Sequence, residues 1–509
     1  MALARTLAMT LAGISGRLVE VEADVAGGVP GFTLTGLPDA SVSEARDRVR
    51  AAVINSGVPW PVRRITVALL PADLRKVGSG LDLAVAVAVL AAAGAIPTEP
   101  VAGTCWLAEL GLDGTLRPVR GVLPAVAAAR RAGVSRMVVA ADNAAEAVLV
   151  EGVDVRVGTR LADLIAWLRG SGAPPARAVA DPVAAEADPG PDLADVSGQS
   201  PAKRALEIAA AGLHHLSLVG APGAGKTMLA ERLPALLPPL CDDIALEVTA
   251  VHSVAGLLDG EASLIRRPPL QAPHHSASVA ALVGGGSHLA RPGAISLAHG
   301  GVLFLDEAAE FSPHALDALR QPMEGGRITL HRGGGAVCYP ARFLLVLAAN
   351  PCPCGARGRD CTCPAAVRRR YQQRLSGPLL DRIDLRVEVD PVPASDLFEA
   401  RPAESSRAVA DRVATARAAA AHRWRAEPWE VNGAAPGAVL RRAPWALPHR
   451  VLAEAEAYLR RGELSARGLD RVLRLSWTVA DLDGATVPTA EHVREALFLR
   501  TTGRSAWAA

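Results

Sequence analysis

Aromatic residues are scarce in this chain, and neither sign of charge is in excess. Phe, Trp and Tyr make up 3% of the 509 residues, and 54 Lys and Arg residues balance 52 Asp and Glu residues. A platform of aromatic side chains for stacking bases is therefore disfavoured, and no global basic field attracts nucleic acid. Any contact with DNA should be local, electrostatic and sensitive to salt.

Cysteines and long apolar segments are also few. Seven cysteines in a chain of this length do not indicate a disulfide framework, which favours a reducing, cytoplasmic location. The N-terminal residues carry no small-residue cleavage site, so we expect no export signal. The longest apolar run begins at Leu81, contains Asp82 and is shorter than the about 20 residues that span a bilayer. We expect a buried core helix there and no membrane contact.

Composition divides the chain into three parts joined by one linker. Residues 170–194 are rich in Pro, Ala and Asp without an apolar period, which is typical of a flexible linker. Residues 1–169 mix alternating strands with Ala-rich helices, an α+β pattern. Residues 195–395 show a βαβ pattern, and residues 396–509 have the period of helices. The chain is therefore predicted to be a multidomain α/β protein with a C-terminal helical bundle or lid.

A phosphate-binding loop lies at residues 220–227, between an apolar strand and a helix. It fits G-x-x-x-x-G-K-[ST], in which glycines let backbone N–H groups approach phosphate oxygens closely. We expect Lys226 to pair with the β and γ phosphates of ATP, and Thr227 to hold Mg²⁺. The predicted nucleotide-binding residues are Gly220, Ala221, Pro222, Gly223, Ala224, Gly225, Lys226 and Thr227.

Two more apolar strands, at residues 301–307 and 342–350, end in polar residues. Strand ends of this kind meet at the carboxyl edge of a parallel sheet, where ligands bind. Asp306 would contact magnesium in its outer shell, and Glu307 would polarise the attacking water. A helix-capping acidic pair is the alternative. Asn350 would orient the water.

A cysteine cluster and a run of arginines follow the last of these strands. The cysteines form C-x-C-x₆-C-x-C and are Cys352, Cys354, Cys361 and Cys363. Four thiolates can close a tetrahedral Zn²⁺ site that orders the loop, and free thiols in a mobile loop are the alternative. The arginines either form a solvated helix face or line the path of a bound phosphate backbone. They are Arg368, Arg369, Arg370 and Arg374.

Seven segments in one order resemble the YifB/ComM family of magnesium chelatase-like AAA+ ATPases, and the resemblance to this family extends over nearly the whole chain. Besides the phosphate-binding loop they are DVSGQ at 195–199, QAPHHSAS at 271–278, ALVGGG at 281–286, RPGAISLAHGGVLFLDE at 291–307, LAANPCPCG at 347–355 and SGPLLDRIDL at 376–385. The resemblance implies a Lon-protease-like (ribosomal S5-like) domain at residues 1–169. It also implies a doubly wound AAA+ domain at 195–395 and a chelatase-type helical domain at 396–509.

The resemblance also implies roles for single residues. Walker B would be Asp306 and Glu307, sensor 1 Asn350, the arginine finger Arg382 and sensor 2 Arg467. A finger from the next subunit neutralises charge on the transferred phosphate, so hydrolysis would require a ring, expected to be a homo-hexamer.

Two alternatives to this arginine finger stay open. Arg374 is a competing finger, and Arg382 could instead form a local salt bridge with Asp381 or Asp384.

The first domain lacks the lysine that Lon-type proteolysis requires. Ser79 lies near the expected nucleophile, but Leu123 lies near the place of the lysine that would take its proton. We therefore predict no protease activity, and assign Ser79 and Asp82 to a turn and a helix cap.

Histidines and a hairpin complete the candidate residues. Structural hydrogen bonding is favoured over metal binding for His274, His275 and His299, because no acidic third ligand lies at helical spacing. Residues 324–341 predict a β-hairpin. By the resemblance such hairpins reach a central pore, and the candidate substrate contacts are Arg327, His331 and Arg332.

The residue patterns predict a magnesium-dependent ATPase, and the resemblance implies that it forms a ring and acts on single-stranded or branched DNA. The ATPase follows from the residues; helicase or branch-migration activity in recombination or transformation follows from the resemblance alone. The alternatives are the motor subunit of a metal chelatase and a protein-remodelling ATPase. A nucleotide-binding scaffold without turnover is disfavoured because Lys226, Asp306 and Glu307 are all present.

Overall fold

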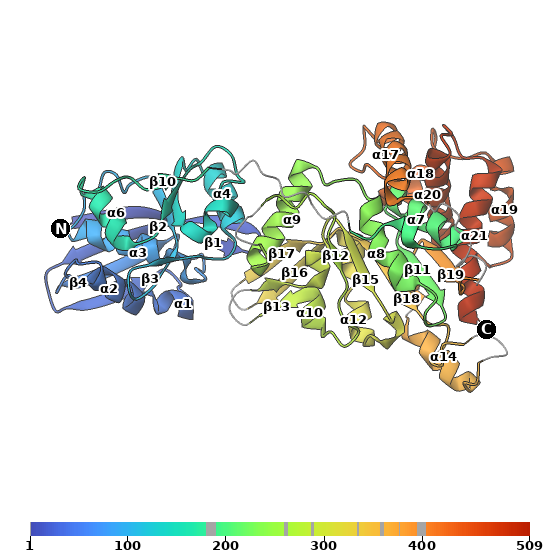
Figure 1. The fold of residues 1–509 in the computed structure, drawn as a ribbon, viewed down its shortest axis with the longest axis horizontal. Coiled ribbons are helices and arrows are strands. Elements are labelled where there is room, and N and C mark those ends of the chain that lie inside the picture. Colours follow the sequence, from blue (N-terminus) through green and yellow to red (C-terminus); the bar gives the residue numbers. More distant parts are fainter. Residues whose placement is uncertain are drawn as a thin grey trace.

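The computed structural model describes residues 2–179, 190–258, 263–286, 290–332, 335–356, 361–375, 377–393 and 404–508. An N-terminal block of strands and helices meets a central sheet, and the C-terminal helices lie at the far end of the molecule (Figure 1). Among the described helices, none combines the length and apolar character that crossing a bilayer requires.

An eight-stranded sheet, in the order β10-β9-β8-β5-β1-β2-β4-β3, organises the N-terminal block. In β2 (Ser15–Ala26), alternate residues such as Val19 and Val21 are buried, because one face of the strand packs on the core. The predicted core helix is α3 (Asp82–Ala92), which is buried along its whole length. The other elements are β1 (Ala2–Ala12), β3 (Gly31–Thr35), α1 (Ala40–Ser43), α2 (Ala45–Asn55), β4 (Arg64–Leu70), β5 (Thr104–Leu107), β6 (Glu109–Leu110), β7 (Leu116–Arg117), α4 (Val122–Arg131), β8 (Arg136–Ala140), α5 (Ala144–Ala147), β9 (Asp154–Gly158) and α6 (Leu161–Leu168).

Part of the predicted linker belongs to this sheet. Strand β10 (Ala176–Arg177) pairs antiparallel with β9, so the chain stays on the sheet beyond residue 169. Residues 180–189 of the linker lie outside the described residues. Beyond them, the Asp192 carboxylate accepts hydrogen bonds from the backbone N–H groups of Ala194 and Ser406, which ties the linker's end to the helical region.

The central sheet is parallel throughout, in the order β12-β15-β18-β11-β19. Neighbouring residues of one strand enter different cores: Val302 and Phe304 pack on one face, and Leu303 and Leu305 on the other. Strands buried on both faces explain the continuous apolar runs in the sequence. The strands are β11 (Leu216–Gly220), β12 (Leu270–Gln271), β15 (Val302–Leu305), β18 (Leu344–Ala349) and β19 (Leu385–Val389).

Helices and two small hairpins surround the central sheet. The predicted hairpin is present as β16 (Arg327–Arg332) and β17 (Gly335–Pro340), which pair antiparallel. The other elements are α7 (Ser200–Gly212), α8 (Lys226–Leu236), α9 (Asp242–Ala255), α10 (Val279–Val283), β13 (Gly284–Gly285), β14 (Arg291–Pro292), α11 (Ala294–Leu297), α12 (Pro313–Asp317), α13 (Arg320–Gly325), α14 (Ala365–Arg374) and α15 (Gly377–Leu380).

The C-terminal helices share a core with one face of the central sheet. Val413 and Val472 belong to the same buried cluster as Leu216 and Leu385, and Figure 1 shows α17 and α20 beside α7. The helical region is therefore packed on the central sheet. Its helices are α17 (Ser406–Arg423), α18 (Gly437–Leu440), α19 (His449–Arg460), α20 (Ala466–Leu482) and α21 (Ala490–Ala508).

The N-terminal block contacts the central part through α4 and α9. The buried carboxylate of Glu146 accepts hydrogen bonds from the backbone N–H of Leu123 and from the hydroxyl of Ser253 in α9. Gly13 lies so close to β17 that a Cβ atom there would come within 2.6 Å of the Cys338 carbonyl oxygen. The hairpin β16–β17 is thus in direct contact with the first domain.

Candidate functional site

The loop at residues 220–227 connects β11 to α8, as its sequence predicts. Gly223 and Gly225 have φ angles of +76° and +89°, which glycine adopts without steric cost. The Lys226 Nζ donates to the carbonyl oxygens of Gly220 and Ala221, both at 2.8 Å. Burial lowers the pKa of Lys226, while the charges of Asp306 and Glu307 oppose that shift.

Four predicted residues meet at the carboxyl edge of the sheet. The Thr227 hydroxyl donates to Asp306 Oδ2 at 2.7 Å, and Lys226 Nζ donates to Asn350 Oδ1 at 3.1 Å. The parallel register β15-β18-β11 explains this meeting, because all three strands end beside the loop. Hydroxyl and carboxylate oxygens in contact are the ligands that Mg²⁺ prefers, so Thr227 and Asp306 fit a magnesium site.

Glu307 has an unusual backbone and a partner that sequence reasoning missed. It lies in the left-handed region, with φ 49° and ψ 43°, and its side chain is 53% exposed. His275 Nδ1 lies 3.0 Å from Glu307 Oε2. In the structure β12 runs parallel to β15, so the histidine-containing loop that follows β12 begins at the same edge, and no residue of that loop signals this placement. His275 thus holds the carboxylate at the P-loop edge.

The other two histidines make structural contacts, as expected. His274 contacts the Ser276 hydroxyl at 2.8 Å. Buried His299 contacts Glu247 at 3.0 Å and accepts from the backbone N–H of Arg342.

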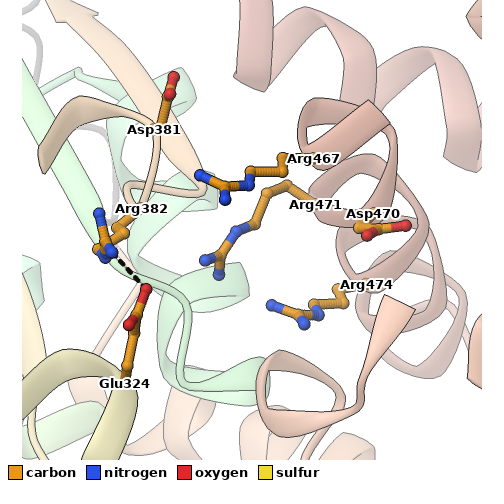
Figure 2. A pocket seen from close by; sticks show the side chains of 7 residues that line it. All are labelled: Glu324, Asp381, Arg382, Arg467, Asp470, Arg471 and Arg474. Atoms are coloured by element: carbon orange, nitrogen blue, oxygen red, sulfur yellow. Dashed lines mark hydrogen bonds and ion pairs between the residues drawn. The ribbon is translucent and has the colours of Figure 1, made fainter. Parts of the chain in front are cut away.

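Arg382 and Arg467 lie together, but at the opposite edge of the sheet from the P-loop. Arg382 precedes β19, whose first residue, Leu385, pairs with Leu216 at the start of β11. The P-loop follows the end of β11, roughly 15 Å away at about 3.3 Å per residue. Arg382 and Arg467 line one cavity of about 220 Å³ (Figure 2). Within one subunit, neither side chain reaches the P-loop.

The predicted salt bridge of Arg382 with Asp381 or Asp384 is wrong, because Arg382 pairs with a different acid. Arg382 binds the carboxylate of Glu324 on α13, and donates to the Pro378 carbonyl oxygen at 2.7 Å. Asp384 is instead buried and binds Arg471 on α20 at 2.9 Å. Burial alone would raise the pKa of Asp384, but the charges of Arg471 and the neighbouring histidines hold it well below its usual range.

Arg374, the competing finger, is engaged close to its own Walker B segment. Its Nη1 donates to Glu310 Oε2 at 2.6 Å and to the Ala309 carbonyl oxygen at 3.2 Å. Of the remaining arginines of the run, Arg369 and Arg370 are exposed on α14, and Arg368 is half-buried. In the hairpin, Arg327 and His331 are exposed, and the side chain of Arg332 lies outside the described residues.

The four clustered cysteines come together beside the P-loop. The sulfur atoms of Cys352, Cys354, Cys361 and Cys363 all lie within 4.8 Å of one another. Tetrahedral zinc with bonds of about 2.3 Å needs sulfur separations of about 3.8 Å, so the donor set fits this metal. Gly355 in the same loop packs on Pro222, since a Cβ atom there would lie 2.5 Å from the proline Cδ.

In the first domain, Ser79 and Asp82 make contacts that the sequence did not predict. The Ser79 hydroxyl donates to Glu109, and buried Asp82 binds Arg48 Nε at 2.7 Å. Asp82 therefore neutralises a cation inside the domain, where an unpaired charge would be costly, and does not cap the helix. Leu123 is buried in α4, as an apolar residue should be.

Comparisons with known proteins give one consistent result. Three family models match: "Magnesium chelatase, subunit ChlI" over residues 192–397, "Subunit ChlI of Mg-chelatase" over 21–143, and "Magnesium chelatase, subunit ChlI C-terminal" over 403–500. An uncharacterised protein of Mycobacterium tuberculosis is 55% identical over 99% of both chains. YifB of Salmonella typhimurium is 41% identical over 97% of this chain and 96% of its own length. The competence protein ComM of Haemophilus influenzae is 40% identical over 99% of this chain and 98% of its own. The chain therefore belongs to the YifB/ComM family of magnesium chelatase-like AAA+ ATPases.

Proposed function

We propose that this chain is a magnesium-dependent ATPase that works as a homo-hexameric ring and remodels DNA. One observation supports the ring: the predicted catalytic residues of one chain lie at two opposite edges of the same sheet. The P-loop and Walker B residues lie at the carboxyl edge, and Arg382 and Arg467 lie at the amino edge. Each nucleotide would then be completed by arginines from a neighbouring subunit.

The carboxyl-edge residues suit ATP binding and water activation. The backbone of residues 220–227 and the Lys226 ammonium would hold the phosphates, while Thr227 would bind magnesium directly and Asp306 would contact it in its outer shell. Magnesium, when bound, neutralises charge on the phosphate oxygens. The Glu307 carboxylate would take the proton from the attacking water, and the Asn350 amide would orient that water.

The domain assignment forms part of the same proposal. Residues 1–169 would be a Lon-protease-like domain without its catalytic dyad, 195–395 the AAA+ domain and 396–509 the chelatase-type helical domain. Ser79 supports the loss of protease chemistry, because its hydroxyl is engaged by a carboxylate and not by a lysine.

DNA is supported as the substrate by exposed cations and by the family. Arg369 and Arg370 on α14, and Arg327 on the hairpin, are exposed and free to approach phosphates. The relative ComM is named a competence protein. With few aromatic side chains available, these contacts would be electrostatic.

DNA-stimulated hydrolysis tests this function. We expect magnesium-dependent ATP hydrolysis by the purified chain to rise when single-stranded or forked DNA is added, and the rise to shrink as salt increases, because phosphate contacts release counterions. Phosphate release is measured at several salt concentrations. A matched variant, Arg369→Ala with Arg370→Ala, should weaken stimulation and leave hydrolysis without DNA unchanged. Hydrolysis indifferent to every DNA tested would argue instead for a protein client or a chelatase partner.

We further propose that the four cysteines hold a structural zinc ion that orders the loop against the P-loop. The contact of Gly355 with Pro222 would let this loop support the shape of the nucleotide site. Zinc would cross-link a segment that has few apolar side chains to fix it.

Thiol counting checks the zinc site. Metal analysis should give one zinc ion per chain. In the native protein only exposed Cys241 and Cys338 should react rapidly with a thiol reagent, because Cys105 is buried and the cluster is metal-bound. A strong chelator should expose four more thiols. Cys354→Ser should lose the zinc and the control Cys338→Ser should keep it; four freely reactive cluster thiols in metal-replete protein would refute the site.

A further inference from the structure

Arg382 is held by a residue that the proposed function does not use. Its guanidinium binds the Glu324 carboxylate, the one ion pair between the cavity residues drawn in Figure 2. The Arg382 side chain is 19% exposed, and its Nε atom is buried with no hydrogen-bond partner among the described residues. A buried donor without an acceptor is costly, so pairing with Glu324 leaves the Arg382 guanidinium incompletely satisfied.

Besides Arg382 and Glu324, the cavity lining holds three arginines and two acids. Arg467, Arg471 and Arg474 project toward it from α20 (Figure 2). Burial and the nearby charge of Arg471 lower the pKa of Arg474. Cations crowded in this way favour an anionic ligand with several oxygens, such as the phosphates of a neighbour's nucleotide.

Glu324 is the acid in this cavity that blocks Arg382. The acid Asp470 binds Arg441, a residue that does not line the cavity. The Asp381 carboxylate points away from the arginines in Figure 2. Glu324 is itself 66% exposed, so it can leave Arg382 without being pulled from a core. A phosphate and Glu324 would compete for the same guanidinium.

The position of Glu324 connects it to the hairpin. It lies near the end of α13, and β16 begins three residues later, at Arg327. The joining residue, Gly326, has a φ of +62° and packs on Arg342, so this connection is short and closely fitted. A displacement of β16–β17 would therefore move Glu324.

We propose that Glu324 is an autoinhibitory counter-ion. It pairs with Arg382 until DNA bound to the hairpin β16–β17 draws Glu324 away. The inference rests on the proposed role of Arg382 in the neighbour's site. It adds a physical route by which a bound substrate raises hydrolysis: the hairpin moves, Glu324 leaves, and Arg382 turns to the phosphates.

Glu324→Gln tests the inference. The amide keeps the shape and removes the charge, so basal turnover should rise about fivefold, the factor that corresponds to about 1 kcal/mol for a partly exposed ion pair. The rate with saturating DNA should stay at the wild-type value, so the ratio of stimulated to basal turnover falls by the same factor. The matched control is Asp470→Asn, which removes an acid from the same cavity without touching Arg382 and should leave both rates unchanged.

Three outcomes overturn the inference. Glu324→Gln could leave basal turnover unchanged, could lower basal and stimulated turnover equally while thermal unfolding stays normal, or could raise basal turnover even with Arg382→Ala. Failure of the proposed function looks different: Arg382→Ala alone would then leave wild-type hydrolysis intact. If DNA does not stimulate the wild-type protein, the basal rates of Glu324→Gln and of Glu324→Gln combined with Arg382→Ala still show whether Glu324 inhibits hydrolysis through Arg382.

Discussion

Glu307→Gln is expected to abolish ATP hydrolysis while leaving ATP binding intact. A positioned general base contributes about 10²–10⁴ in rate, so kcat should fall by about that factor. Binding should persist because, in the proposed site, Lys226, Thr227 and Asp306 would hold the phosphates and magnesium without Glu307. Phosphate release measures the first effect, and equilibrium binding of a fluorescent ATP analogue measures the second.

Two control variants make this result specific. Glu310→Gln changes an acid three residues away that faces Arg374, and it should keep most of the hydrolysis. Lys226→Ala should lose binding as well as turnover. If Glu307→Gln kept wild-type turnover, the base would have to be sought elsewhere at this edge. The trapped ATP state of Glu307→Gln is also the best sample for measuring the mass of the ring by light scattering.

The site residues at the carboxyl edge could be predicted from the sequence because a residue that follows a buried strand must lie at that end of the sheet. Lys226, Asp306 and Asn350 each follow a buried apolar strand, and parallel pairing brings those ends together. The apolar period likewise predicted β2 and α3. A short-range sequence pattern is sufficient to predict the position of a residue when that position depends only on the strand or helix that contains it.

Contacts between distant elements could not be predicted in this way. Glu324 and Arg382 are 58 residues apart, and Asp384 and Arg471 are 87 apart. Arg382 has two acids in its own segment, but Glu324 on α13 pairs with Arg382, and Arg471 on α20 pairs with Asp384. His275 was assigned a structural role because no acidic third ligand lies at helical spacing, and no residue of its own loop indicates Glu307 as a partner. In the linker, β10 was missed because two residues are too short for a period.

Arg382→Ala is expected to be inactive alone and to regain activity when mixed with Glu307→Gln. A finger contributes about 10³–10⁵ in kcat, so each homogeneous variant should be nearly inactive. In mixed rings, a subunit with an intact Glu307 can sit beside one with an intact Arg382. Random equimolar assembly makes about a quarter of the interfaces of this kind, since each half is present with a probability of about one half. Phosphate release after co-refolding or subunit exchange measures the recovery.

Arg374→Ala provides the contrast that identifies the finger. Arg374 contacts Glu310 and Ala309 next to its own Walker B segment, so its loss should act within the same subunit that carries Glu307. A mixture with Glu307→Gln then has no intact pair to form, and should stay inactive if Arg374 is needed at all. Arg467→Ala should behave like Arg382→Ala, because both side chains line one cavity at the far edge of the sheet. Recovery with Arg374→Ala and none with Arg382→Ala would reverse the assignment and leave the amino-edge cavity without a catalytic role.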